Sequence, residues 1–170
     1  MDITFSRTTG REMTRLIFYL GSILIAAVCA VATVQETACQ KELRESIAGS
    51  NEQPPRVGQR IPVCDNEGNY APKQCSGSQC YCVMKDAAVI EGFNVSVWEA
   101  KDQNCKCARD KAEYSARGII GKMHRCLPNG NYDSIQCTGS VCYCADENGQ
   151  KVGTTTVHIT KTQELQCSCY

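Results

Sequence analysis

The hydrophobic residues of this chain are concentrated in one stretch close to the N-terminus. Residues 16–35 run for twenty positions without a charged side chain, and three arginines precede them. A basic segment, an apolar segment and then small residues are the pattern of a secretory signal peptide. We therefore expect residues 1–32 to be a signal peptide that is cleaved after Ala32. Since about 20 apolar residues can also cross a bilayer, an uncleaved anchor in a membrane is the alternative.

Beyond this stretch, the apolar positions predict only short elements. Apolar side chains recur every four residues from Cys39 to Ile47, behind a Thr37–Gln40 pair that has the spacing of a capping box. This pattern predicts a helix at 38–48, and a weaker one predicts a second helix at 108–116. Aromatic and β-branched residues predict strands at Tyr81–Met84, Val95–Trp98, Tyr143–Ala145 and Thr154–Ile159. The expected fold class is α+β, with a short helix, a small antiparallel sheet and long loops.

Twelve of the fourteen cysteines form two sets with nearly the same spacing. Five cysteines of the first set reappear 62 residues later, whereas Cys39 and Cys107 are 68 residues apart. The first loop of the first set is therefore six residues longer, in the region of residues 49–62. Such a duplication indicates two tandem modules, at residues 38–105 and 107–168. The sets are Cys39, Cys64, Cys75, Cys80, Cys82 and Cys105, and Cys107, Cys126, Cys137, Cys142, Cys144 and Cys167.

The secretory signal determines how these cysteines are interpreted. In an oxidising compartment, closely spaced cysteines indicate disulfides. The two histidines, His124 and His158, are not at the spacing of a pair of zinc ligands, so we expect no metal and no other cofactor. Modules of about 65 residues bury too little apolar surface to be stable without such bonds. Six cysteines allow fifteen pairings. Among them, geometry disfavours only a disulfide between Cys80 and Cys82, because an extended segment holds these two residues about 6 to 7 Å apart.

Charge and motif content exclude several classes of function. Without residues 1–32 the chain has 15 Lys and Arg against 16 Asp and Glu, so no basic field is available for nucleic acid or an anionic membrane. Paired cysteines leave no thiolate for a Cys-His nucleophile, and neither a Gly-x-Ser-x-Gly motif nor a paired-carboxylate motif is present. We therefore expect a secreted, extracellular protein that is not an enzyme.

One pattern occurs in both modules. Cys-x3-Gly-Asn-Tyr-x3-Gln-Cys-x-Gly-Ser-x-Cys-Tyr-Cys spans Cys64–Cys82 and again Cys126–Cys144. It resembles the thyroglobulin type-1 repeat, whose hallmark is Gln-Cys followed closely by Cys-Trp-Cys-Val, and the resemblance covers residues 38–168. The family's sequential pairing implies three disulfides in each module. They are Cys39–Cys64, Cys75–Cys80, Cys82–Cys105, Cys107–Cys126, Cys137–Cys142 and Cys144–Cys167.

The resemblance also implies a function. Family members of the thyropin kind inhibit papain-like cysteine proteases, with a wedge in which the loop before the second cysteine and the loop between the third and fourth enter the active-site cleft. In the first module these loops are Val57, Gly58, Gln59, Arg60 and Ile61, and Ser76, Gly77, Ser78 and Gln79. In the second they are Ile120, Gly121, Lys122 and Met123, and Thr138, Gly139, Ser140 and Val141. The expected partner is therefore a papain-like cysteine protease of the cathepsin L type.

Two departures from the family pattern affect this expectation. Tyr81 and Tyr143 replace the central Trp, and four residues separate the third and fourth cysteines where inhibitory members tend to have six. A shorter hairpin reaches less far into a partner. The alternative function is an extracellular matrix or adhesion module without inhibitory activity, because type-1 repeats also occur in such proteins.

Two further positions predict modifications. Asn94 begins an Asn-Val-Ser acceptor site for glycosylation. Cys29 lies in the expected signal peptide, so once the twelve framework cysteines are paired Cys169 alone remains, at the position at which a third repeat would begin. It predicts a disulfide-linked dimer, and the alternatives are the end of a truncated array or a capped free thiol.

Overall fold

The computed structural model describes residues 35–48 and 60–167. The chain divides into two compact units, residues 1–35 and 36–170, and both cysteine sets fall within the second. The expected signal peptide, residues 1–32, lies outside the described residues. Among the residues that are described, no helix is both long and apolar enough to span a membrane.

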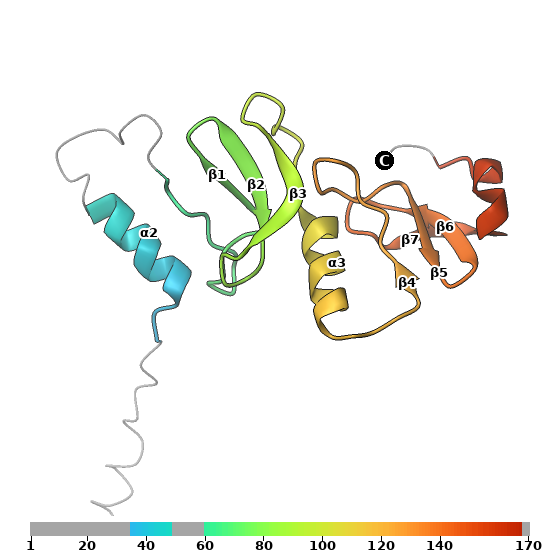
Figure 1. Ribbon diagram of the computed structural model, residues 1–170, viewed down its shortest axis with the longest axis horizontal. Helices are drawn as coiled ribbons and strands as arrows, with labels where there is room; N and C mark the ends of the chain where they lie inside the picture. Colours follow the sequence, from blue (N-terminus) through green and yellow to red (C-terminus); the bar gives the residue numbers. More distant parts are fainter. Residues whose placement is uncertain (1–34, 49–59, 168–170) are drawn as a thin grey trace, which may run out of the picture. The chain divides into compact units, whose positions relative to one another are not determined.

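Repeat one, which we define as residues 36–105, consists of one helix followed by a small sheet (Figure 1). Helix α2 (Ala38–Ala48) precedes strands β1 (Lys73–Ser76), β2 (Gln79–Val83) and β3 (Val89–Ser96). The three strands pair antiparallel in the order β1-β2-β3. The α+β class expected from the sequence is thereby confirmed.

Repeat two, residues 106–167, has the same order of elements. Helix α3 (Lys106–Ala116) precedes strands β4 (Lys122–Met123), β5 (Ile135–Thr138), β6 (Val141–Ala145) and β7 (Lys151–His158), and a 3-10 helix η1 (Ile159–Glu164) follows. The four strands pair antiparallel in the order β4-β5-β6-β7. This sheet has one strand more than the sheet of repeat one, namely the short strand β4.

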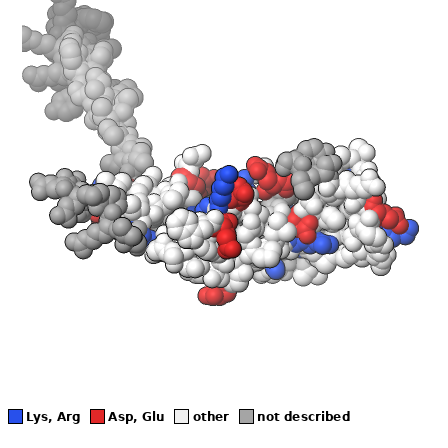
Figure 2. Space-filling model, turned by 90° about the horizontal axis from the view of Figure 1, so that it is seen from above, with Lys and Arg blue, Asp and Glu red and all other residues white. Residues whose placement is uncertain are grey.

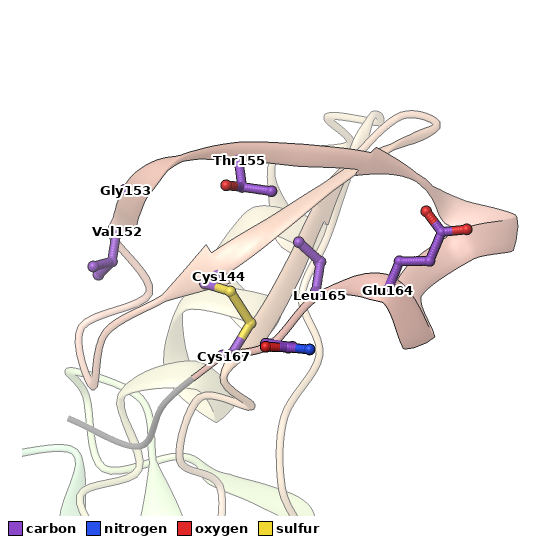
Figure 3. A pocket seen from close by; sticks show the side chains of 8 residues that line it. Cys144, Val152, Gly153, Thr155, Glu164, Leu165 and Cys167 are labelled. Atoms are coloured by element: carbon purple, nitrogen blue, oxygen red, sulfur yellow. A yellow bond between two sulfur atoms is a disulfide. The ribbon is translucent and has the colours of Figure 1, made fainter.

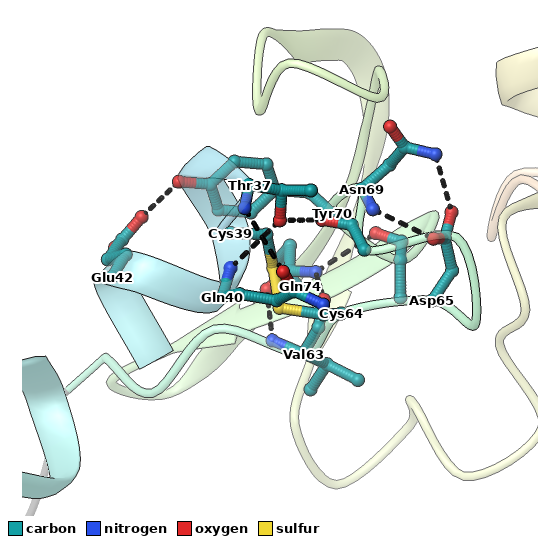
Figure 4. Close-up of a disulfide and its surroundings, with 12 residues drawn as sticks. Thr37, Cys39, Gln40, Glu42, Val63, Cys64, Asp65, Asn69, Tyr70 and Gln74 are labelled. Carbon is teal, nitrogen blue, oxygen red and sulfur yellow. Dashed lines mark hydrogen bonds between the residues drawn. A yellow bond between two sulfur atoms is a disulfide. The ribbon is translucent and has the colours of Figure 1, made fainter. Parts of the chain in front are cut away.

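The capping box expected at the start of α2 is present. The Thr37 amide donates to Oε1 of Gln40 at 3.0 Å, and the Gln40 amide donates to Oγ1 of Thr37 at 3.3 Å (Figure 4). These two bonds satisfy backbone donors that a helix N-terminus otherwise leaves unpaired. The predicted helix at 38–48 is confirmed with its bounds.

Two other sequence predictions need correction. Helix α3 begins at Lys106, two residues before the predicted start, because Cys105 adopts a left-handed conformation with φ 60° and the chain enters the helix directly after it. The strand predicted at Val95–Trp98 is wrong at both ends, and β3 already begins at Val89. Strand β3 stops at Ser96, since the Glu99 amide turns back to the Ser96 carbonyl at 2.9 Å.

Disulfides make up much of the core of each repeat. In the described residues, six disulfides join the cysteines in sequential order: Cys39–Cys64, Cys75–Cys80, Cys82–Cys105, Cys107–Cys126, Cys137–Cys142 and Cys144–Cys167. Few large apolar side chains are buried with them; in repeat one, Tyr70 and Val83 pack beside Cys39. The small apolar core agrees with the need for covalent cross-links in modules of this size.

A buried tyrosine in each repeat bonds to a carboxylate on the helix. The Tyr70 hydroxyl donates to Glu42 of α2, and the Tyr132 hydroxyl donates to Asp110 of α3. The hydrogen bond to Glu42 raises the pKa of Tyr70, and burial followed by the bond to Asp110 raises the pKa of Tyr132. Both hydroxyls therefore stay protonated and fasten the helix to the turn that follows the second cysteine.

An arginine from repeat two connects the two repeats. Arg109 on α3 is only 5% exposed. Its Nε donates to the Val83 carbonyl at 2.8 Å, and its Nη2 donates to the Tyr70 carbonyl at 2.7 Å. Both acceptors belong to repeat one. Burial lowers the pKa of this guanidinium, but arginine remains charged in proteins, so these bonds are charge-assisted.

A turn of repeat two also packs against repeat one. Gly130 has φ 83°, and a Cβ at this position would lie 2.5 Å from Sγ of Cys82. Oδ1 of the adjacent Asn131 accepts from the Asn104 amide at 2.7 Å and from the Cys105 amide at 3.3 Å. Side-chain and backbone contacts therefore join the two repeats around the junction of Cys105 and Lys106.

Within the described residues, the surface of repeat two that matches the one covered by α3 in repeat one borders a pocket. Ile90 and Phe93 of repeat one pack with Ala108 of α3 beside the Cys82–Cys105 disulfide. At the matched positions, repeat two has Val152 and Thr155, which border a pocket of about 310 Å³ (Figure 3). Its other lining residues are Cys144, Gly153, Glu164, Leu165, Gln166 and Cys167. The surface in repeat two is thus more polar than the covered one in repeat one.

Candidate functional site

The buried glutamine of the Gln-Cys pattern positions the segment before the second cysteine. Gln74 on β1 accepts from the Val63 amide at 3.0 Å and donates to the carbonyls of Val63 at 2.7 Å and Ala71 at 2.9 Å (Figure 4). Gln136 on β5 makes the same three bonds in repeat two, to the amide and carbonyl of Arg125 and to the carbonyl of Asp133. Each side chain is thereby satisfied although it is buried.

The loop between the third and fourth cysteines is a tight hairpin in both repeats. Cys75 pairs with Cys80 and Cys137 with Cys142 across the hairpin, and a disulfide joins each pair. The first tip residue is Gly77 or Gly139, with φ 59° and 56°. A left-handed first residue is typical of a type II′ turn, which glycine adopts without a steric penalty. The tips are exposed and rigidly closed at their base.

In repeat two the two predicted loops lie side by side. The Gly139 amide at the hairpin tip donates to the Gly121 carbonyl at 2.6 Å. Strand β4 continues this contact, because Lys122 pairs with Thr138 and Met123 with Cys137. The loop before the second cysteine and the hairpin therefore form one edge, as a wedge requires.

Repeat one is described only in part at the same place. Arg60 and Ile61 are described, whereas the predicted loop residues Val57, Gly58 and Gln59 lie outside the described residues. The predicted hairpin residues Ser76, Gly77, Ser78 and Gln79 form the tip between β1 and β2. For repeat one, the contact between the two loops remains a prediction.

The structure adds a third segment to this end of each repeat, which the sequence did not reveal. The Val97 amide donates to the Ser78 carbonyl at 2.9 Å, and in repeat two the Ile159 amide donates to the Ser140 carbonyl at 2.8 Å. Both segments follow the last strand of their sheet and pass beside the hairpin tip. Because the sequence placed Val95–Trp98 inside a strand, Trp98 was not expected to be at a tip.

The edge of repeat two exposes apolar side chains. Ile120 is 92% exposed, and Met123, Val141 and Ile159 are also exposed. Figure 2 shows acidic and basic side chains interspersed on one face of the molecule, without a large patch of one sign. Among the eight predicted loop residues of this edge only Lys122 is charged, so contact through it would depend on shape and apolar area more than on charge.

The stem of the same edge contains a partly buried histidine. The His124 ring packs edge-on against Tyr114 of α3, with ring centroids 5.2 Å apart. The Tyr114 hydroxyl accepts from the Lys122 amide at 3.1 Å, so the helix also supports the loop. Burial is the main reason that the pKa of His124 is lowered, and nearby Lys122 adds to the effect. The imidazole is therefore neutral at pH 7.

The remaining predicted positions fall in different places. Asn94 is exposed on β3, so a glycan could be attached there. Cys169 lies outside the described residues. Within residues 35–48 and 60–167, no group of three or more potential metal ligands comes together, and all twelve cysteines are in disulfides.

Comparison with known proteins identifies the repeats. The family model of the thyroglobulin type-1 repeat matches residues 39–105 and 99–167. Thyroglobulin from Mus musculus is 29% identical over 118 residues, which are 61% of this chain and 4% of thyroglobulin. Equistatin from Actinia equina is 33% identical over 98 residues, or 54% of this chain and 42% of equistatin. Nidogen-1 from Homo sapiens is 41% identical over 71 residues, or 38% of this chain and 6% of nidogen-1. The chain thus spans less than half the length of each of these three relatives. Since the two matched ranges cover most of its residues, the chain belongs to the thyroglobulin type-1 repeat family.

Proposed function

We propose that this protein inhibits papain-like cysteine proteases of the cathepsin L type by reversibly occupying their active-site cleft. The observation that supports this most directly is the hydrogen bond between Gly139 and Gly121, which holds the two predicted loops of repeat two in one edge. A disulfide at the base of the hairpin limits the conformational entropy that the loop loses on docking. Glycine at the tip lets the backbone approach the partner closely.

The proposal implies occlusion without chemistry by the inhibitor. Every described cysteine is in a disulfide, and the edge contains no activated nucleophile, so we propose that the protein is not an enzyme. A tip closed by a disulfide and by strand pairing fits poorly into a protease as an extended substrate. The bound protease should therefore recover full activity on dilution, and the inhibitor should remain uncleaved.

Titration of the secreted chain against papain and a cathepsin L-type protease tests this function. We expect inhibition at or below micromolar concentration. Ser140→Arg and Ser78→Arg place a long cation on an exposed hairpin tip of repeat two and repeat one respectively. Each should weaken inhibition by its own repeat, whereas Gln150→Arg, on an exposed turn outside the edge, should not. No inhibition by the unmodified chain would exclude the proposed function.

The second candidate function is an extracellular matrix or adhesion module. It is favoured by the hairpin tips, because four residues rather than six between the third and fourth cysteines give a short reach. The similarity to part of nidogen-1 is compatible with either function. A chain that binds cell-surface or matrix preparations at its hairpin tips and leaves both proteases fully active would support this candidate over inhibition.

We also propose the processing that the sequence predicts. Cleavage after Ala32 would release a secreted protein whose N-terminus is residue 33, which N-terminal sequencing of the secreted chain tests. Glycosylation of Asn94 would add a mass that an endoglycosidase removes. A dimer through Cys169 would run at twice the monomer mass without reductant, and Cys169→Ser would abolish it.

A further inference from the structure

Repeat one holds the chain's single tryptophan in solvent beside its hairpin tip. Trp98 is 87% exposed, the largest exposed fraction of any aromatic side chain in the described residues. It follows Val97, whose amide donates to the carbonyl of the tip residue Ser78 at 2.9 Å. The indole therefore belongs to the same edge as the predicted inhibitory hairpin.

The backbone around Trp98 is fixed on both sides. The Trp98 amide donates to Oγ of Ser96 at 3.4 Å, and the Glu99 amide donates to the Ser96 carbonyl at 2.9 Å. The buried Ala100 follows, and its carbonyl accepts from Nζ of Lys73 on β1. A turn anchored in this way presents the indole at a defined place, so little backbone entropy remains to be lost when a partner covers it.

Folding of the repeat does not require an indole at this position. Trp98 contributes almost no buried area, and repeat two has Thr160 at the matched position of the same framework. Oγ1 of Thr160 lies 3.0 Å from Nδ1 of His158 instead. Large aromatic side chains are costly to leave in water, and tryptophan is enriched among the few interface residues that dominate binding energy.

The geometry points to Trp98 as the main affinity-determining contact of repeat one. It inserts into an apolar surface pocket that flanks the catalytic cleft of the protease, while the Gly77–Ser78 tip enters the cleft. This inference rests on the proposed function. Repeat two lacks the indole and exposes Ile120 at its edge, so the two repeats differ in which flanking pockets of a protease they fit.

Exchange of the residue between the repeats tests this contact. Trp98→Thr in a chain that also carries Ser140→Arg measures repeat one alone and introduces a side chain that the framework already accepts in repeat two. We expect the inhibition constant to rise roughly 30-fold, the size of effect typical of a hot-spot residue. The conservative variant Trp98→Phe should lose less, and Glu99→Gln on the same turn should change nothing.

A second measurement observes the indole directly. Because the chain has one tryptophan, incorporation of 5-fluorotryptophan gives one ¹⁹F signal. Addition of papain should shift or broaden this signal. If the Ser140→Arg chain inhibits, the added Trp98→Thr change leaves its inhibition constant within twofold, and the signal does not move, the inference is wrong. If the chain does not inhibit but the signal still shifts, the Trp98 contact stands and the proposed function fails. If the chain does not inhibit and the signal does not shift, the contact and the proposed function both fail.

Discussion

Gln136 holds the backbone of Arg125 through two hydrogen bonds, with its side-chain oxygen 3.1 Å from the Arg125 amide and its side-chain nitrogen 2.8 Å from the Arg125 carbonyl. Because Arg125 directly precedes the second cysteine of repeat two, this contact fixes where the loop returns to the sheet. Gln74 does the same for Val63 in repeat one. The buried glutamine is thus the framework residue on which the position of the candidate edge depends.

Gln136→Met should destabilise the protein and displace the loop. The change leaves the Arg125 amide without its partner and removes one of the two hydrogen bonds that the Arg125 carbonyl accepts, and we expect a cost of about 2 to 3 kcal/mol in the free energy of unfolding. Gln163→Met, at an exposed position, should stay within about 0.5 kcal/mol. Urea denaturation of the intact chain measures both. Equal stability of the two variants would show that the glutamine contacts have no structural weight.

Arg109→Met should loosen the junction between the repeats. It removes the two charge-assisted hydrogen bonds that Arg109 donates to the carbonyls of Val83 and Tyr70 in repeat one. We therefore expect the free energy of unfolding to fall by about 2 to 4 kcal/mol. Lys41 occupies the matched helix position in repeat one and is exposed. Lys41→Met is therefore the control, with an expected change below about 0.5 kcal/mol. Denaturation and amide exchange at Val83 report the difference.

Gly130→Ala should cost more than Gly153→Ala. Both glycines have positive φ, at 83° and 71°, so both variants carry the conformational penalty of an alanine there. Only Gly130 would also bring its Cβ to 2.5 Å from Sγ of Cys82, whereas nothing lies within 4 Å of a Cβ at Gly153. We expect the Gly130 variant to be at least about 2 kcal/mol less stable than the Gly153 variant, by thermal or urea unfolding. A smaller loss at Gly130 would mean that the junction is not closely packed.

Acid should weaken repeat two through His124. The folded protein lowers the pKa of this imidazole, mainly by burial, below its ordinary value of 6.5. Between the two values the unfolded chain binds more protons, so the stabilisation is present above pH 6.5 and is lost as the pH falls through the folded pKa. Lys122 and Lys111 act in the same direction, whereas Asp110 opposes them; Tyr114 and Tyr132 supply the surrounding rings.

His124→Phe keeps an aromatic ring but removes the titrating group. The loss of unfolding free energy between pH 7.5 and pH 5 should therefore be smaller in this variant than in the unmodified protein. Repeat one has Pro62 at the matched position and provides no such group. Identical pH profiles of the two proteins would show that His124 is not responsible.

The sequence predicted elements whose determinants are local. The Thr37–Gln40 capping box defines the start of α2, and the repeated cysteine register reveals two modules without any structure. The end of β3 was wrong because the β-branched and aromatic residues from Val95 to Trp98 suit a strand, whereas Ser96 among them accepts from the Trp98 and Glu99 amides and closes a turn. Local propensity is a weak guide where a single side-chain bond changes the chain direction.

Contacts between the repeats were beyond the reach of sequence patterns. Arg109 is the only buried charged residue of its helix, and nothing in its spacing shows that it enters the neighbouring repeat. The same holds for Trp98, whose exposure depends on where β3 ends. The loop before the second cysteine was identified by family resemblance, but its bond to the hairpin tip required the three-dimensional arrangement.

The central claim is tested most directly by measuring inhibition of papain and a cathepsin L-type protease by the secreted chain. Ser140→Arg, Ser78→Arg and the double variant are measured in parallel. The account predicts reversible inhibition at or below micromolar concentration, partial loss in each single variant and near-complete loss in the double variant. Full protease activity in the presence of micromolar unmodified chain, or equal inhibition by the double variant, would contradict it.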